Sequence, residues 1–160
     1  MHRGSSIGFK LNEQKLTIAF AESATAGHLC ADFSLMENAG SFLKGGIICY
    51  DAEIKESLLE VDPQLIAKFS PESMEGTREI ALGLSKIIPA DIHVGITGLT
   101  CPGGSESTEK PVGTMFIYAC KNSQHIFSER ITFSGNKLDI VLATANHFAC
   151  MLENYLDKES

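Results

Sequence analysis

Short apolar runs alternate with stretches of helical periodicity along most of this chain, and that alternation limits the folds it can adopt. Runs of strand-like residues lie at 16–20, 45–50, 91–97 and 114–120. A further run at 125–133 alternates apolar and polar residues in part, which is typical of an edge or half-exposed strand. Strands that alternate with helices, followed by adjacent strands late in the chain, favour an α/β fold with a mixed sheet.

Three segments carry the signals of helices. The stretch "AESATAGHLCADF" follows the first strand and predicts a helix through Phe33. A second helix is expected to start with Ser70 as N-cap and Pro71 at its first position. The clearest stripe, with a period of 3.6 residues, runs over about 137–155. We therefore expect an α/β/α sandwich of three layers, with helices on both faces of the sheet.

The length of 160 residues fits one domain, which can bury a core without disulfides or metals. The opening "MHRGSS" resembles a remnant of cloning, so residues 1–10 are expected to be an N-terminal extension. Residues 11–160 are expected to form the single domain.

Composition excludes several classes of protein. The formal charge of −7 argues against a nucleic-acid partner, although a local group of N–H donors can still hold a small anionic ligand. The five cysteines are scattered without a CxxC pair, as expected in a reducing compartment. No apolar run is long enough to span a membrane, and no secretory signal is visible. We expect a cytoplasmic protein without a membrane partner; the sequence leaves homo-oligomer formation open.

One connection is much longer than the usual 4 to 6 residues or so between elements, namely residues 98–113, "GLTCPGGSESTEKPVG". Its glycines let backbone amides approach a ligand, and its hydroxyls and one lysine can bind an anion. Lys110 either contacts that ligand or holds the loop in place. The alternative is a solvated connection with glycines for its turns. The candidate binding residues here are Thr97, Gly98, Thr100, Gly103, Gly104, Lys110 and Gly113.

The turn "AESATAG" at 21–27 lies between a strand and a helix, where unpaired N–H groups favour an anion. Ser23 or Thr25 is expected to cap that helix, and Glu22 must be paired if it is buried. Gly46, in the next strand, allows close approach of a ligand. The candidate binding residues in this part are Glu22, Ser23, Thr25, Gly27 and Gly46.

Ser41, Tyr50 and Lys55 form a candidate catalytic set. A serine becomes a nucleophile when a base takes its proton, and a lysine can be that base once its pKa is lowered by burial. The alternative for Lys55 is an ordinary solvated helix residue. The histidines lack the spacing of a zinc site, so neither metal nor cofactor is expected. Cys101 is an alternative nucleophile, or simply a small residue that fits the loop.

Four segments in this order resemble the C-terminal domain of CinA, the competence/damage-inducible protein: "AESATAG", "GGIICYDAEIKESLLEV", "GITGLTCPGGSESTEKPVGT" and "FSGNK". The resemblance covers about residues 11–156. It implies an α/β/α domain and a nicotinamide-nucleotide amidase that needs no cofactor. Such an enzyme converts nicotinamide mononucleotide to nicotinate mononucleotide and ammonia.

By position, the resemblance implies Ser41 as nucleophile, Lys55 as general base and Tyr50 as a residue that relays a proton or orients the pair. Amides of a glycine-rich turn would stabilise the oxyanion. After "FSG" the family tends to carry two basic residues that suit phosphate, and here the positions hold Lys137 and Val141. The segment around Ser41 is shorter than usual in the family. The alternative is therefore a catalytically impaired nucleotide-binding or regulatory domain.

Overall fold

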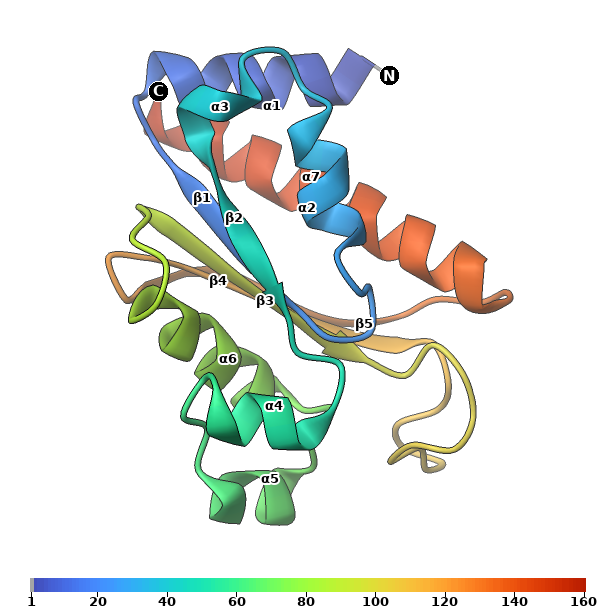
Figure 1. The fold of residues 1–160 in the computed structure, drawn as a ribbon. Coiled ribbons are helices and arrows are strands. Elements are labelled where there is room, and N and C mark those ends of the chain that lie inside the picture. The colour runs from blue at the N-terminus through green and yellow to red at the C-terminus, as the bar shows by residue number, and fades with distance from the viewer. Residues whose placement is uncertain (1) are drawn as a thin grey trace.

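A mixed sheet of five strands forms the centre of the molecule (Figure 1). The structure is a computed structural model that describes residues 2–160, with side chains from Ser6 onward. The strand order is β2-β1-β3-β4-β5, with β1 parallel to β2 and β3, and the pairs β3–β4 and β4–β5 antiparallel. This confirms the expected mixed sheet with a late edge strand. The strands are β1 (Ile18–Glu22), β2 (Leu43–Ile48), β3 (Ile92–Gly98), β4 (Thr114–Lys121) and β5 (Gln124–Thr132).

Helices cover both faces of the sheet, as expected for three layers (Figure 1). One layer consists of α1 (His2–Glu13), α2 (His28–Ser34), α3 (Ala39–Phe42) and α7 (Lys137–Glu159). The other consists of α4 (Ala52–Ser57), α5 (Pro63–Phe69) and α6 (Met74–Ser85).

Each face of the sheet has its own apolar core. Under α7, the rings of Phe20, Phe33 and Phe148 pack edge to face or tilted, with the centroids of the first two 4.9 Å apart. On the other face, α6 lies so close to β3 that a Cβ on Gly95 would come within 2.3 Å of the Thr77 carbonyl oxygen. The close approach fixes α6 against the sheet and hence the position of the residues that precede it.

The N-terminal residues belong to the packed fold, which differs from the expected extension over 1–10. Ile7 and Leu11 of α1 are fully buried in the α7-side core. Lys10 lies 2.6 Å from Asp157 and 3.2 Å from Glu153 on α7. The amphipathic pattern of α1 was not recognised because its first five residues, "HRGSS", contain no apolar residue other than glycine.

The N-cap predicted for the second helix was wrong by three residues. Ser70 ends α5 with a φ of 74°, and Ser73 caps α6 by accepting a hydrogen bond from the Gly76 amide at 3.0 Å. Both serines precede the helix, but only Ser73 has the extended backbone that an N-cap requires.

The connections around β1 create a crevice at one end of the sheet. The chain passes from β1 to β2 through α2 and α3 on one face, and from β2 to β3 through α4, α5 and α6 on the other (Figure 1). Ligands of open α/β sheets bind where such connections diverge, beyond the carboxyl ends of the parallel strands. The glycine-rich loop between β3 and β4 leaves from this same end.

Candidate active site

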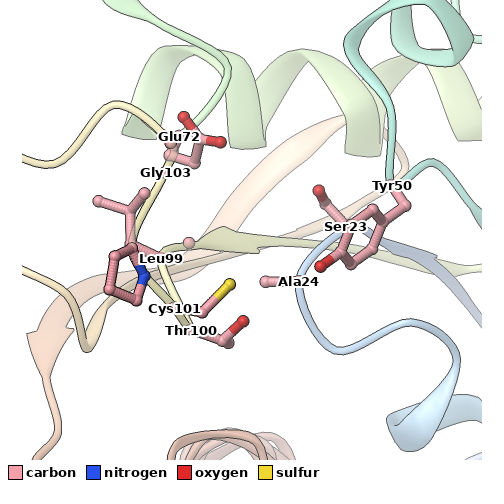
Figure 2. A pocket seen from close by; sticks show the side chains of 11 residues that line it. Ser23, Ala24, Tyr50, Glu72, Leu99, Thr100, Cys101 and Gly103 are labelled. Atoms are coloured by element: carbon pink, nitrogen blue, oxygen red, sulfur yellow. The ribbon is translucent and has the colours of Figure 1, made fainter. Parts of the chain in front are cut away.

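A cavity of about 190 Å³ opens at the carboxyl ends of β1, β2 and β3. Figure 2 shows Ser23, Ala24 and Tyr50 on one side and Glu72, Leu99 and Gly103 on the other, with Cys101 between them. The full lining is Ser23, Ala24, Tyr50, Glu72, Gly98, Leu99, Thr100, Cys101, Pro102, Gly103 and Gly104. Residues from three strand ends and from the long loop therefore meet at one place.

Ser23 lies one residue beyond β1 and is fixed by the sheet. Its amide donates to the carbonyl oxygen of Ile96 on β3 at 2.9 Å, which continues the parallel pairing past the end of the strand. The residue is 5% exposed, and its side chain borders the cavity. A serine hydroxyl in such a rigid place reaches a ligand without any rearrangement of the backbone.

Lys55 reaches the same point from α4. Asp51 caps this helix, and its side chain accepts a hydrogen bond from the Glu53 amide at 2.8 Å. The amine of Lys55 lies 3.1 Å from Ser23 Oγ and donates to it. Lys55 is 2% exposed, so the alternative of a solvated helix residue is wrong.

Burial makes the charged form of Lys55 less favourable than it is for a solvated lysine. Burial lowers the pKa of its ammonium group below the ordinary lysine value, and Cys49, Glu72 and Asp51 oppose that shift in this order. Burial also raises the pKa of the Cys49 thiol to about 11, so this thiol is uncharged at neutral pH. A buried lysine with a lowered pKa, hydrogen-bonded to a serine, has the properties of a general base and its nucleophile.

Ser41 lies at the opposite end of the sheet. It belongs to α3, which enters β2 at its amino end, whereas Tyr50 and Lys55 follow the carboxyl end of β2. The six residues of β2 alone separate the two ends by roughly 16 Å. Ser41 instead borders an exposed pocket with Phe9, Asn12, Glu13, Glu37 and Asn38. The fold thus places Tyr50 and Lys55 beyond one end of β2 and Ser41 at the other, and the serine hydrogen-bonded to Lys55 is Ser23.

Tyr50 lies at the rim of the cavity, and Lys137 is hydrogen-bonded to this tyrosine. Tyr50 is 52% exposed, and its hydroxyl accepts a hydrogen bond from Lys137 Nζ at 3.2 Å. Lys137 is the first residue of α7, which a capping box between Asn136 and Asp139 starts at this point. The hydrogen bond from Lys137 raises the pKa of its own ammonium group, so the rim carries a positive charge.

The turn after β1 is closed by Glu22 rather than by a serine or threonine cap. The buried Glu22 carboxylate accepts hydrogen bonds from the Thr25 hydroxyl at 2.6 Å and from the amides of Gly27, Leu29 and Cys30. The expected capping by Ser23 or Thr25 was therefore wrong, and Glu22 already occupies the anion site at the start of α2. Gly27 and Gly46 border a separate pocket of about 280 Å³ beside β2.

The long loop contributes part of its predicted residues to the cavity. Gly98, Thr100, Gly103 and Gly104 line it, whereas Thr97 is buried and its hydroxyl lies 2.8 Å from that of Thr77 on α6. The amide of Gly103 donates to the Glu106 carboxylate at 2.9 Å. That amide can serve an oxyanion only after Glu106 has moved away.

Lys110 and Gly113 hold the loop. Lys110 Nζ donates to the hydroxyl of Ser70 and to the carbonyl oxygen of Glu72, both at 2.7 Å. Gly113 has a φ of 100°, and a Cβ there would lie 2.0 Å from the carbonyl oxygen of Phe133. Of the two roles left open for Lys110, the structure shows the one that fixes the loop.

Glu72 is the charged residue of the cavity lining that sequence reasoning missed. It stands three residues after the end of α5 and just before the α6 cap, where no motif marks it. Neither a membrane-spanning helix nor a cluster of metal-binding side chains occurs among the residues that the structure describes.

Comparisons with known proteins agree with this architecture. The family model of the CinA C-terminal domain matches residues 3–156. A CinA-like protein of Petrotoga mobilis is 35% identical over 89% of this chain and 37% of its own length. A putative competence-damage inducible protein of Alkaliphilus metalliredigens is 33% identical over 93% of this chain and 36% of its own length. The chain thus spans little more than a third of these curated relatives.

Solved structures match over nearly the whole chain. A CinA superfamily protein from Klebsiella pneumoniae superposes with a TM-score of 0.92 at 24% identity, covering 98% of this chain and 97% of the other. One from Enterobacter cloacae gives 0.90 at 26% identity, covering 96% and 90%. Because the family model covers almost all of the sequence and the fold agrees, this chain belongs to the CinA C-terminal domain family.

Proposed function

We propose that this domain is an amidohydrolase that deamidates nicotinamide mononucleotide to nicotinate mononucleotide and ammonia. The observation that carries the proposal is the contact of 3.1 Å between Ser23 Oγ and Lys55 Nζ at the wall of the cavity. The family resemblance suggests the substrate, and the geometry supports the type of reaction. The serine in the proposed pair is Ser23 in place of Ser41.

The reaction begins with the neutral amine of Lys55. It accepts the proton of Ser23 as Oγ attacks the carboxamide carbon, and the tetrahedral intermediate carries the negative charge on the former carbonyl oxygen. Lys55 then returns that proton to the leaving nitrogen, so ammonia departs and an ester with Ser23 remains. Water, deprotonated by the same amine, attacks the ester carbon; the C–Oγ bond breaks, Lys55 returns the proton to Ser23 Oγ, and the carboxylate is released. Each proton taken by Lys55 is returned within the cycle.

The surface around the cavity can accommodate the ribose phosphate of such a nucleotide. A cavity of about 190 Å³ admits the pyridine ring with its carboxamide, while the ribose phosphate remains near the surface. Lys137 offers a positive charge at that surface, and Tyr50 presents its ring beside it. The Tyr50 hydroxyl is hydrogen-bonded to Lys137 at this surface. We therefore assign Tyr50 the role of orienting the substrate.

The test is ammonia release from nicotinamide mononucleotide by the purified protein. Lys55→Ala is expected to abolish release, and Lys44→Ala, which changes an exposed lysine on β2, should leave it unchanged. Turnover that persists in a folded Lys55→Ala variant would remove Lys55 from the mechanism. A wild-type protein that binds the mononucleotide without turnover from about pH 6 to 9 would favour the alternative, a nucleotide-binding or regulatory domain.

A further inference from the structure

Glu72 connects the glycine-rich loop with the start of α6. Its carboxylate accepts a hydrogen bond of 2.5 Å from the hydroxyl of Ser105. The same Ser105 hydroxyl lies 3.3 Å from the hydroxyl of Ser70. Lys110 donates to Ser70 and to the Glu72 carbonyl oxygen. The hydrogen bonds among these four residues hold one wall of the cavity in place.

The Glu72 side chain also borders the cavity of Ser23 (Figure 2). When Lys55 takes the Ser23 proton, a positive charge forms on a buried amine, where water cannot solvate it. A negative charge nearby stabilises that ammonium group, in the same way that a carboxylate stabilises the imidazolium of a serine protease. Glu72 lines the same cavity as Ser23, to which Lys55 is hydrogen-bonded, and its charge acts to raise the pKa of Lys55.

The other groups around Lys55 leave this role to Glu72. Cys49, at the end of β2, is an uncharged thiol at neutral pH because burial raises its pKa to about 11. Asp51, at the start of α4, has a weaker effect on Lys55 than Glu72 and is exposed. The carboxylate of Glu22 is turned to the amides of α2. Lys110 adds an opposing positive charge beside Glu72.

We propose that Glu72 is a positioning residue of the candidate site, which holds the glycine-rich loop through Ser105 and stabilises by its charge the ammonium form of Lys55. The kinetic consequence rests on the proposed function, whereas the charge effect on Lys55 does not. Two variants separate the two roles. Glu72→Gln removes the charge and keeps an acceptor for Ser105, and Ser105→Ala removes the hydrogen bond and keeps the charge.

The experiment titrates Lys55 by NMR of its ¹³Cε signal, assigned with Lys55→Met, in the full chain without substrate. Glu72→Gln should move the Lys55 titration to lower pH and leave amide exchange over 101–110 unchanged. Ser105→Ala should speed that exchange and move the titration less. Asp51→Asn, which keeps a capping side chain, is the charge control and should also move it less.

An unchanged Lys55 titration in folded Glu72→Gln would overturn the proposal. So would an equal or larger shift in Ser105→Ala or Asp51→Asn. In a protein that turns over, the acidic limb of kcat/KM should move to lower pH in Glu72→Gln, because neutral Lys55 then persists to lower pH. Absence of turnover would count against the proposed function alone, since the titration needs no substrate.

Discussion

The two ends of the parallel strands differ in the burial and the hydrogen bonding of the serines that they hold. At the carboxyl end, Ser23 and Lys55 are buried, hydrogen-bonded to each other and enclosed by a pinned loop. At the amino end, Ser41 is exposed beside a polar pocket. Each end holds a serine, but only the first has a buried lysine within hydrogen-bond distance. The reactivity proposed for Ser23 therefore depends on the end of the sheet at which the serine lies.

The comparison predicts its largest effect for the two serines themselves. Ser23→Ala is expected to lower ammonia release by about 10³-fold or more, since it removes the proposed nucleophile. Ser41→Ala should stay within about twofold of the wild type. The rates of both variants would be measured with nicotinamide mononucleotide. A large loss in folded Ser41→Ala, with little loss in Ser23→Ala, would reverse the assignment of the two ends.

Glycine substitutions test whether the two ends also differ in mechanical constraint. Gly113→Ala should lower the free energy of unfolding by about 2 kcal/mol or more, because of its φ of 100° and the nearby Phe133 carbonyl oxygen. Gly40→Ala, in the open helix α3, should raise it by up to about 1 kcal/mol. Urea unfolding measures both, and equal costs would mean that the loop end is no more constrained.

The buried amine of Lys55, at the carboxyl end of the parallel strands, should make the free energy of unfolding depend on pH. The pKa of Lys55 is lowered in the folded protein, so folding loses stability as pH falls from 10.5, the ordinary lysine value, to the folded pKa. Lys55→Met should therefore be stabilised relative to wild type most strongly below the folded pKa, with the gain shrinking as pH rises toward 10.5.

Lys44→Met is the matched control for that titration, because Lys44 is exposed on β2. Its stability relative to the wild type should vary little with pH. Thermal unfolding followed at several pH values would measure both. A gain in Lys55→Met that is the same at every pH would show that Lys55 is not buried as an amine.

The rim charge should give the smallest effect. Lys137→Met is expected to raise KM for the mononucleotide about threefold and leave kcat unchanged, because an exposed charge contributes modestly and is screened by salt. The difference in KM between Lys137→Met and the wild type should become smaller at high ionic strength. An equal drop in kcat would instead place Lys137 in the chemical step.

Much of the fold could be predicted from the sequence, because its strands are short apolar runs and its last helix carries a clear stripe. The three-layer arrangement followed from their order. The helix α1 could not be recognised, because its first residues are polar or glycine and its buried face consists of few side chains. The start of α6 was placed at Ser70 because Pro71 follows it, and only backbone geometry shows that Ser73 is the cap.

Only part of the candidate site could be predicted from the sequence. Lys55 and Tyr50 share one short segment, so their proximity follows from the chain. Ser23 is separated from Lys55 by 32 residues and comes from another strand, so only the pairing of β1 with β2 brings it near. Ser41 is closer in sequence but is carried to the far end by β2. The role of Glu22 as helix cap likewise depends on how the turn folds back.

The most direct test of the central claim is to label the protein with a small sulfonyl fluoride and to map the modified residue by peptide mass spectrometry. Such reagents react with serines that are activated by a neighbouring base. We predict modification of Ser23 in the wild type, and loss of that modification in Lys55→Ala. Modification at Ser41 or Cys101, or equal labelling of Ser23 in the absence of the Lys55 amine, would contradict the account.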